Sequence, residues 1–293
     1  MGENSPLLRF EWILMEKRWL EDKAYVERCF AGKELFGDSF APQDIERWYE
    51  LESHAYAQMS GSGKTTKEIA NYGYHEMNKH YGYRYLPDIR YERVLGFGSG
   101  YGDDMLPVLD RCGEVFIIEP GDVFWEHHLG EKNVSYHKPK PSGDMPFEDS
   151  AFDLILCFSA LHHVANVSKI ISEFARVLRK DGWLIIREPT TSMGDWFAER
   201  PGTTSCERGI PADIMNGFIL GNGLTIRKQT PCDFAPWNRL VSSFGISCYS
   251  SRFATRVDAV FSRIFSFNRA YYAKNVFRKF RPGARFYVCA KDA

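Results

Sequence analysis

Apolar and polar residues change their spacing in a regular way through the middle of the chain. Five short apolar runs and a weaker one near 134–137 are predicted strands: 92–97, 114–119, 134–137, 152–158, 183–188 and 224–229. Four segments between them have apolar residues at helical spacing: 102–112, 121–128, 167–179 and 211–221. Because a run such as FDLILCF is apolar throughout, both faces of its sheet must be covered. The alternation therefore predicts an α/β fold with a parallel sheet between two layers of helices.

Helical segments flank this core on both sides. Spacing predicts helices at 7–30, 43–59 and 67–83, and a last strand, ARFYVCAK, close to the C-terminus. Two or three helices precede that strand, so it is separated from the core by an insertion. We therefore expect four parts: a helical addition at 1–88, an α/β core at 89–232, a basic helical insertion at 233–283 and a last strand at 284–293.

Charge is distributed unevenly along the 293 residues. The formal net charge is −1, so the whole molecule has no field that would attract nucleic acid, and 44% hydrophobic residues suffice for one core with additions. The segment from Asp233 to Arg285, however, has ten basic side chains against two acidic ones. Such a segment can lie on an anionic membrane, hold a phosphorylated acceptor or nucleic acid, or pack on the sheet edge with its arginines outward. We expect an anionic or lipid-linked small acceptor and peripheral membrane contact through 252–281.

Other residue types exclude several classes of site. Seven cysteines are scattered without a C-x-x-C pair, and the N-terminus resembles neither a signal peptide nor a membrane span, so we expect a cytoplasmic protein. The histidine pairs at 127–128 and 162–163 lack ligand spacing, so no metal is expected. The segment SGSGKTT at 60–66 is interpreted as a linker, because Gln58 stands where a phosphate-binding loop needs glycine.

The stretch RVLGFGSGYGDD, at 93–104, has glycine at every second position from Gly96 to Gly102. It joins a predicted strand to a helix-compatible segment, and such a turn lets backbone approach a ligand and points free amides at it. A dinucleotide fingerprint needs glycine at the first, third and sixth positions, but the sixth is Tyr101 or Asp103 here. A nucleotide-like ligand other than a dinucleotide is therefore favoured.

The alternating G-x-G-x-G, followed by a strand EVFIIEP that ends at Glu119, resembles the class I S-adenosylmethionine-dependent methyltransferases. The resemblance extends to DMPFEDSAFDLILCFSALHHV at 144–164 and RVLRKDGWLIIREP at 176–189, which are similar to small-molecule, UbiE-like and lipid methyltransferases. It implies a Rossmann-like sheet with an antiparallel last strand and S-adenosylmethionine as the cofactor. In that family, the acid at the position of Glu119 bonds the ribose hydroxyls.

The resemblance also assigns cofactor binding to single residues and identifies two departures. The cofactor-binding residues it implies are Gly96, Phe97, Gly98, Ser99, Gly100, Glu119, Pro120, Ser142 and Phe158. Gly96 stands where the family has an acid that helps hold the cofactor's amino acid end, so Asp103, Asp104 or water must substitute. Ser142 or Pro141 stands where the family has an acid that contacts adenine. Tyr72 and Tyr74 precede the first strand, in a segment that often closes over the cofactor in the family, and are interpreted as lid residues or as buried tyrosines.

Methyl transfer to a hydroxyl needs a base that removes its proton. His162 and His163 follow the 152–158 strand at the edge where open α/β sheets bind ligands, and we favour His163 as that base. An oxygen acceptor is favoured because Phe158-Ser159 replaces the Asn/Asp-Pro-Pro-aromatic signature of amino-methylating enzymes. The long connection that follows the 183–188 strand supplies candidate acceptor-binding residues: Glu188, Trp196, Arg200 and Arg208.

These observations predict S-adenosylmethionine-dependent O-methylation of a small or glycan-like acceptor, which can be phosphorylated or lipid-linked. The segments EP, SMGDW, RPG and ERGIP between 188 and 211 resemble bacterial methyltransferases associated with surface-polysaccharide synthesis. Two alternatives stay open. One is an RNA methyltransferase that uses the basic insertion, and the other is a methyltransferase-like module that binds without catalysis because of Gly96.

Overall fold

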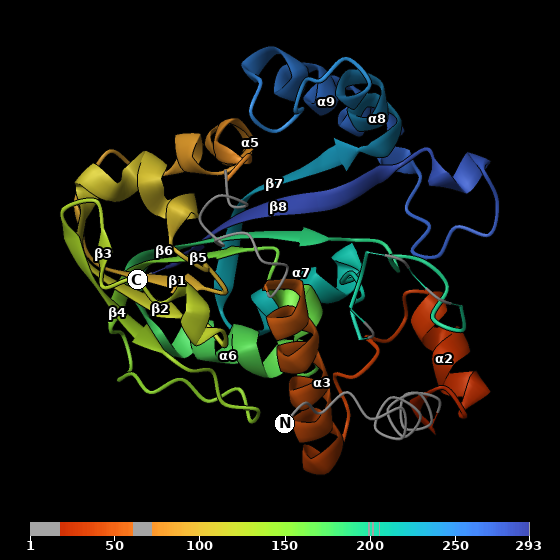
Figure 1. The fold of residues 1–293 in the computed structure, drawn as a ribbon, viewed down its shortest axis with the longest axis horizontal. Coiled ribbons are helices and arrows are strands. Elements are labelled where there is room, and N and C mark those ends of the chain that lie inside the picture. The colour runs from red at the N-terminus through yellow and green to blue at the C-terminus, as the bar shows by residue number, and fades with distance from the viewer. Residues whose placement is uncertain (1–17, 61–71, 199, 201, 205, 293) are drawn as a thin grey trace.

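The computed structural model describes residues 18–60, 72–198, 200, 202–204 and 206–292. Within them, eight strands form one sheet in the order β3-β4-β2-β1-β5-β6-β8-β7 (Figure 1). The strands are β1 (Tyr91–Phe97), β2 (Cys112–Ile118), β3 (His128–Leu129), β4 (Lys132–His137), β5 (Phe152–Phe158), β6 (Leu178–Pro189), β7 (Leu224–Phe234) and β8 (Pro282–Lys291). Three predicted segments lie partly outside the described residues. They are the linker at 60–66, of which only Ser60 is described, and the first parts of the helices predicted at 7–30 and 67–83.

The direction of the strands follows the prediction. β1, β2, β4, β5 and β6 pair in parallel, whereas β8 pairs antiparallel with both β6 and β7. The α/β fold class and its antiparallel last strand are thus confirmed. The chain runs from β1 outward to β4 and then returns to β5 on the other side of β1, which leaves a topological switch point between β1 and β5.

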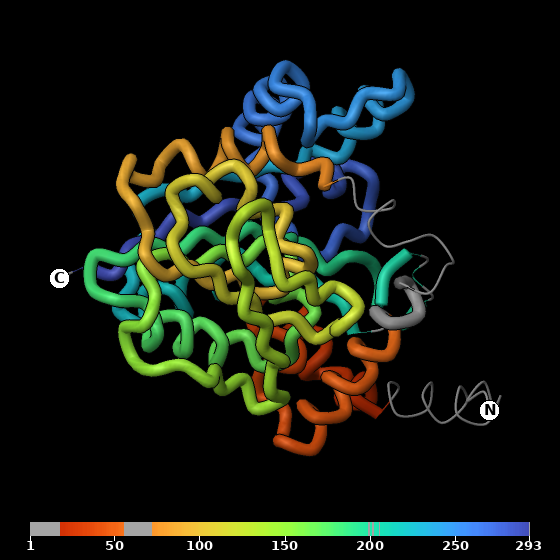
Figure 2. The backbone as a smooth tube through the Cα atoms, turned by 60° about the vertical axis from the view of Figure 1, so that its left-hand side comes forward, coloured from red at the N-terminus to blue at the C-terminus, as the bar shows by residue number. Residues whose placement is uncertain are grey.

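Helices cover both faces of the sheet. They are α2 (Lys23–Phe30), α3 (Pro42–Ser60), α5 (His75–Tyr81), α6 (Val167–Val177), α7 (Ala212–Gly221), α8 (Ala235–Ser242) and α9 (Arg252–Ile264). Because successive strand residues point to opposite faces, Leu95 packs in one core cluster with residues of α6 and α7, and Val94 packs in another with residues of α5. Figures 1 and 2 show α8 and α9 on one side of the sheet and α2 and α3 on the other.

Two predicted helices around the glycine turn are wrong. The segment predicted as a helix at 102–112 is a 3₁₀ helix from Asp103 to Arg111, and Pro107 inside it removes a backbone donor. The segment at 121–128 forms only a 3₁₀ turn, Asp122–Phe124, before the chain enters the short hairpin of β3 and β4. A third boundary also differs, since α6 ends at Val177 and 180–182 already belong to β6.

The N-terminal addition docks where β5 ends. Its aromatic cluster includes Trp19, Phe36 and Trp48, and the Trp48 indole Nε1 donates to the carbonyl oxygen of His163 at 2.7 Å. Asp38 accepts from the backbone N–H of Ser168 at 2.8 Å and so caps the first turn of α6. These contacts place α3 across the carboxyl edge of the sheet. Of the helices that the structure describes, none is long and apolar enough to cross a membrane.

Candidate active site

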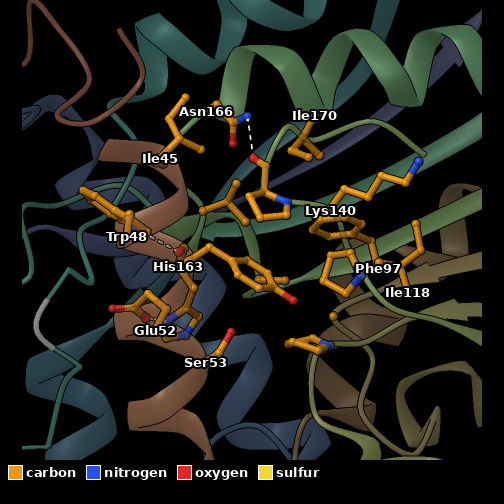
Figure 3. A pocket seen from close by; sticks show the side chains of 18 of the residues that line it. Ile45, Trp48, Glu52, Ser53, Phe97, Ile118, Lys140, His163, Asn166 and Ile170 are labelled. Carbon is orange, nitrogen blue, oxygen red and sulfur yellow. Dashed lines mark hydrogen bonds and ion pairs between the residues drawn. The ribbon is translucent and has the colours of Figure 1, made fainter. Parts of the chain in front are cut away.

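A cavity of about 130 Å³ lies at the carboxyl ends of β1, β2 and β5 (Figure 3). The strand ends contribute Phe97, Gly98, Glu119, Ser159 and Ala160 to its lining. The opposite wall is α3, through Ile45, Trp48, Tyr49, Glu52 and Ser53. The segment 139–141 and the start of α6 complete the lining, with Asn166 Nδ2 donating to the carbonyl of Pro141 at 3.2 Å. The cavity therefore lies at the switch point of the sheet, where open α/β folds bind ligands.

Gly98 gives this cavity its floor. Its φ is +63°, and a Cβ there would lie 2.4 Å from the Cβ of Ala160, so no larger residue fits. Its amide donates to the carbonyl of Ile118 at 2.8 Å, which ties the glycine turn to the end of β2. Backbone is thus exposed to the cavity at the position where the sequence predicted close approach to a ligand.

Glu119 connects the glycine turn to the next loop. Its two carboxylate oxygens accept from the amides of Gly100, at 3.0 Å, and Gly121, at 3.1 Å. Burial raises the pKa of Glu119 to about 7, although these two hydrogen bonds oppose the shift. The side chain lines the cavity beside Pro120. Both residues thus lie where a ligand in the cavity can reach them.

The structure explains why the expected acid is missing at Gly96. A Cβ at this position would lie 2.1 Å from Met105 Cε and 2.5 Å from Ser99 Oγ. The acid that lies beside the turn is Asp104, whose Oδ2 accepts from the Ser99 hydroxyl at 2.9 Å. Asp104 is only 3% exposed, its Oδ1 has no hydrogen-bond partner, and burial raises the pKa of its carboxyl to about 7. A buried carboxylate oxygen is therefore left for a donor that the protein does not provide.

Arg187 is a site residue that the sequence reasoning missed. Its buried guanidinium donates to Ser159 Oγ at 2.9 and 3.1 Å and to Asn78 Oδ1 at 3.1 Å, and it lies 4.3 Å from the ring centroid of Tyr74. Tyr72 accepts from Asn78 at 2.7 Å. Neither Tyr72 nor Tyr74 lines the cavity, and the wall opposite the strand ends is α3. An arginine inside the apolar run WLIIRE was the available signal.

His162 cannot serve as the predicted base. Its Nδ1 lies 2.8 Å from Glu188 and its Nε2 lies 3.2 Å from Glu207, and the side chain is buried. Burial alone would lower the pKa of His162, but hydrogen bonds to both carboxylates raise it to about 9. The ring is therefore an imidazolium near neutrality, and both of its nitrogens already carry protons.

His163 lines the cavity and has a different environment. Its Nδ1 lies 2.7 Å from Glu52 Oε2 (Figure 3). Its Nε2 lies 3.7 Å from Glu207 Oε1. Because an ionised carboxylate only accepts, the Nδ1 that contacts Glu52 carries a proton. Glu52 also accepts from the Thr204 hydroxyl at 2.7 Å and the Cys206 amide at 3.0 Å. Neither Glu52 nor Glu207 was predicted, since their distance from His163 along the sequence gave no signal.

The four residues predicted to bind the acceptor instead brace the fold. Glu188 is fully buried and accepts from the amides of Ala160 and Leu161 at 2.8 Å. Arg208 is also fully buried, and its guanidinium donates to four backbone carbonyls: Phe36, Leu161, His162 and Ala165. Trp196 stacks on Phe30 with centroids 4.2 Å apart, and Arg200 donates to the carbonyls of Thr204 and Glu207. None of the four lines the cavity.

The remaining predicted cofactor residues divide into two groups. Phe97, Gly98, Glu119 and Pro120 line the cavity, and Pro141 lines it in place of Ser142, whose hydroxyl donates to Asp144 at 2.9 Å. Gly96, Ser99 and Gly100 shape the turn from behind. Phe158 is outside the cavity. It belongs to the core cluster on the opposite face of the sheet, where its ring meets that of Tyr83 edge to face with centroids 5.8 Å apart. The structure thus does not bring Phe158 to the cavity, because alternate residues of a strand point to opposite faces.

One group in the described part of the chain has the composition and spacing of a metal site. It comprises His162, His163 and Glu207, whose ligand atoms lie within 4.8 Å of one another. Both ring nitrogens of His162 carry protons that face the carboxylates of Glu188 and Glu207, so neither has a lone pair for a metal ion. The expectation that no metal binds stays a prediction.

Comparison with known proteins identifies the domain. Residues 95–186 match the family model described as a methyltransferase domain. This is a class I S-adenosylmethionine-dependent methyltransferase domain. The cofactor of this family is S-adenosylmethionine.

Curated relatives of the methyltransferase domain match only parts of the chain. The uncharacterized methyltransferase YcgJ of Bacillus subtilis is 34% identical over 101 residues, which cover 32% of this chain and 39% of the relative. Phthiotriol/phenolphthiotriol dimycocerosates methyltransferase 1 of Mycobacterium ulcerans is 32% identical over 80 residues, which cover 26% and 30% of the two chains. The chain thus spans less than half the length of these relatives.

Solved structures support the fold over a longer part of the chain. A Haloferax volcanii methyltransferase, solved in complex with the Trm112 methyltransferase activator, has a TM-score of 0.54 at 15% identity and covers 80% of this chain and 96% of that one. A SAM-dependent methyltransferase from Archaeoglobus fulgidus has a TM-score of 0.51 at 13% identity, and the match covers 80% of this chain and 99% of that one. At these identities the likeness extends to the fold alone.

The residues of the methyltransferase domain fit S-adenosylmethionine. Gly98 leaves space that a Cβ would fill, Glu119 presents a carboxylate to the cavity, and Asp104 has an unpaired buried oxygen beside the glycine turn. Glu119 would hold the ribose hydroxyls, and Asp104 would hold the ammonium group of the amino acid end. Both carboxylates bond the glycine turn, Asp104 through the Ser99 hydroxyl and Glu119 through the Gly100 amide.

Proposed function

We propose that the protein transfers a methyl group from S-adenosylmethionine to a hydroxyl oxygen of a small or glycan-like acceptor. The observation that carries this proposal is one cavity that contains both the glycine turn with Glu119 and the His163–Glu52 pair. Bound S-adenosylmethionine supplies an electrophilic methyl carbon, whose bond to sulfur breaks with the electron pair going to sulfur. The chain itself then has to orient the acceptor and remove one proton.

His163 is the proposed proton acceptor. Its Nδ1–H donates to Glu52 at 2.7 Å, so the carboxylate would stabilise the imidazolium that forms when the ring accepts the proton of the acceptor hydroxyl. Glu52 is held in turn by Thr204 and Cys206, which fixes the orientation of the ring. α3 supplies Glu52 and the cavity wall, so it excludes water from the place where the proton moves.

A lipid-linked acceptor is favoured by the surface of the insertion. Ten of the sixteen large apolar side chains that are exposed among the described residues lie between 240 and 280, with Phe267 77% and Phe277 86% exposed. Arginines are interleaved with them, including Arg252 and Arg269, whose side chains are about three-quarters exposed. Apolar side chains beside cations suit a surface of anionic lipid, where the cations meet headgroups and the rings enter the boundary of the acyl chains.

The decisive experiment separates binding from turnover. S-adenosylhomocysteine is titrated calorimetrically, with ATP and NAD as controls, and transfer of labelled methyl is then measured on hydroxylated, phosphorylated and lipid-linked sugars. We expect specific binding of S-adenosylhomocysteine, an O-methylated product, and loss of turnover by about 10²-fold or more in His163→Ala with nearly unchanged S-adenosylhomocysteine affinity. Full activity in His163→Ala would remove the base assignment. Binding without turnover on any acceptor would favour a non-catalytic module, and salt-dependent RNA methylation would favour the RNA alternative.

A further inference from the structure

A second cavity, of about 150 Å³, shares no lining residue with the first. It lies past the carboxyl end of β6, between the start of α7, the start of β8 and the segment 266–271. Its walls are mainly polar. The polar residues that line it are Thr190, Thr191, Asp213, Asn216, Gln229, Ser266, Asn268, Arg269, Arg281 and Arg285.

Arg285 is the residue that gives this cavity its character. It projects from β8, its Nε is buried, and that atom has no hydrogen-bond partner. Arg187 and Arg208, whose side chains are buried in the fold, by contrast each donate several hydrogen bonds. A desolvated guanidinium donor without a partner is unfavourable, and an anion in the cavity would remove that cost.

The charges around the cavity leave it positive. Arg281 donates to the carbonyls of Ala270 and Tyr271, which orients its guanidinium without neutralising it. Arg269 has only Asp213, at 3.8 Å and on the exposed rim, as an ion-pair partner. Three guanidiniums thus face one carboxylate among the lining residues. Arginine forks match the oxygens of a phosphate, and the hydroxyl and amide side chains beside them suit the polyol that carries it.

The connection 190–211 places this cavity beside the proposed methyl-transfer site. At one end Thr191 accepts from the amide of Gly209 at 3.0 Å, and the Tyr271 hydroxyl donates to the carbonyl of Gly209 at 2.7 Å. Two residues before Gly209, Glu207 contacts His162 and also His163, which lines the first cavity. The described residues of this connection thus contact the lining of the first cavity through Glu207 and line the second through Thr190, Thr191 and Pro211.

We propose that the second cavity binds the phosphate group of a phosphorylated small molecule, and that this molecule is the methyl acceptor. The second half of the proposal rests on the proposed function. A phosphate held by Arg285 and Arg281 would fix one end of the acceptor, and its hydroxyl would then be presented toward His163.

The test is a calorimetric titration of the full chain with inorganic phosphate and glucose 1-phosphate, beside glucose and glucuronate. Wild-type protein binds both phosphates and does not bind glucose; binding of glucuronate as tightly as glucose 1-phosphate would overturn the phosphate assignment in favour of a carboxylate. Arg285→Gln weakens phosphate binding at least tenfold, Arg285→Lys weakens it less, and the exposed control Arg90→Gln, whose partner is Glu92, leaves it unchanged.

Binding of S-adenosylhomocysteine in the same variants separates the two proposals and reports on folding. Its affinity should stay within twofold of wild type in Arg285→Gln. Phosphate affinity that is unchanged in Arg285→Gln, or absent in wild-type protein that binds S-adenosylhomocysteine, would overturn the anion site and leave the proposed function intact. Phosphate binding without S-adenosylhomocysteine binding would overturn the proposed function and with it the acceptor assignment. With a phosphorylated acceptor, Arg285→Gln should raise KM with little change in kcat.

Discussion

Asp104 is a buried acid that costs the free protein stability. Burial raises the pKa of its carboxyl to about 7, above the ordinary value of an aspartate, although hydrogen bonds from the Ser99 hydroxyl and the Met105 backbone oppose the shift. An acid whose folded pKa is raised favours folding when protonated, so this contribution is lost as pH rises from about 4 through 7. At pH 8 the ligand-free protein therefore contains an ionised group that a cation in the site would stabilise.

We predict that Asp104→Asn at pH 8 stabilises the free protein and weakens the cofactor site. The free energy of unfolding should rise by on the order of 1–4 kcal/mol, because the substitution removes a buried charge. Affinity for S-adenosylhomocysteine should fall about tenfold or more, whereas 5′-methylthioadenosine, which lacks the amino acid end, should bind as before. Urea unfolding and calorimetry measure both effects. Equal losses for the two ligands would contradict the assignment of the ammonium group to Asp104.

His162 shows the opposite dependence on pH. Its pKa is raised to about 9, above the ordinary histidine value, since Glu188 and Glu207 outweigh the effect of burial. The stabilisation is complete below about pH 6.5 and is lost as pH rises toward 9, with an order-of-magnitude size of about 3 kcal/mol. In urea, wild-type protein should lose more stability than His162→Gln between pH 6 and 9.5. Parallel losses in the two proteins would show that this histidine does not carry the charge.

At the scale of elements, α3 connects the N-terminal addition to the active site. Trp48 is buried in the aromatic cluster, stacks on Trp19 with centroids 5.8 Å apart and donates to the carbonyl of His163. On the next turn, Glu52 contacts the ring of that same histidine. Loss of the cluster should therefore affect both the docking of α3 and the cavity that it covers.

We predict that Trp48→Ala destabilises the protein by about 3–5 kcal/mol, or releases α3 from the sheet edge, because a large buried ring is removed. S-adenosylhomocysteine affinity should fall in both cases, since α3 forms one wall of the cavity. Trp48→Phe keeps most of the packing and loses the hydrogen bond, so it should cost only about 1 kcal/mol. Thermal unfolding and ligand titration of both variants provide the check; unchanged affinity in Trp48→Ala would mean that α3 is not needed to hold the ligand.

At the scale of the whole molecule, the insertion concentrates basic and apolar groups that the rest of the chain lacks. The net charge is −1 although the segment from 233 to 285 has ten basic and two acidic side chains. α8 and α9 lie on the sheet face opposite α2 and α3, so a membrane bound there would not cover the N-terminal addition (Figures 1 and 2).

We predict that the protein co-sediments with vesicles of mixed anionic and neutral phospholipid and not with purely neutral ones. The double variant Phe267→Ser and Phe277→Ser should weaken binding at least tenfold, because two exposed rings that enter the bilayer boundary are removed. The exposed Val123 and Leu220 lie outside the insertion, and their replacement by serine is the matched control. Binding should also weaken at high salt. Equal binding of the two double variants would exclude the insertion as the docking surface.

The glycine turn and Glu119 were predictable because their information is local. Gly98 sits between a strand and a turn, and Glu119 ends the next strand, so the sequence order alone places both at one edge of a parallel sheet. The histidine pair was located in the same way. The sequence near the pair does not show which of the two histidines faces the cavity. That depends on carboxylates from distant segments, namely α3 and the connection after β6.

Sequence reasoning was wrong where the chain folds back on itself. Trp196, Arg200 and Arg208 are typical of a binding loop. In the structure Trp196 stacks on Phe30 of α2, Arg200 donates to carbonyls within the connection, and Arg208 donates to the carbonyls of Phe36 and Leu161. Polar residues in a long connection have two uses, ligand binding and satisfaction of buried backbone carbonyls, and composition does not distinguish them. The insertion, by contrast, was predicted from its charge and from the distance between β7 and β8.

The sequence by itself determined the α/β sheet and placed the glycine turn and the acid of the second strand at its carboxyl edge, because periodicity and turn chemistry act over a few residues. Only the tertiary structure decided that Asp104 lies buried beside the glycine turn, that Glu52 contacts His163, and that Nε of Arg285 is left without a partner at a second cavity. These three depend on distances between segments far apart in the chain. Side-chain chemistry at such a site is therefore set by packing, which no local pattern encodes.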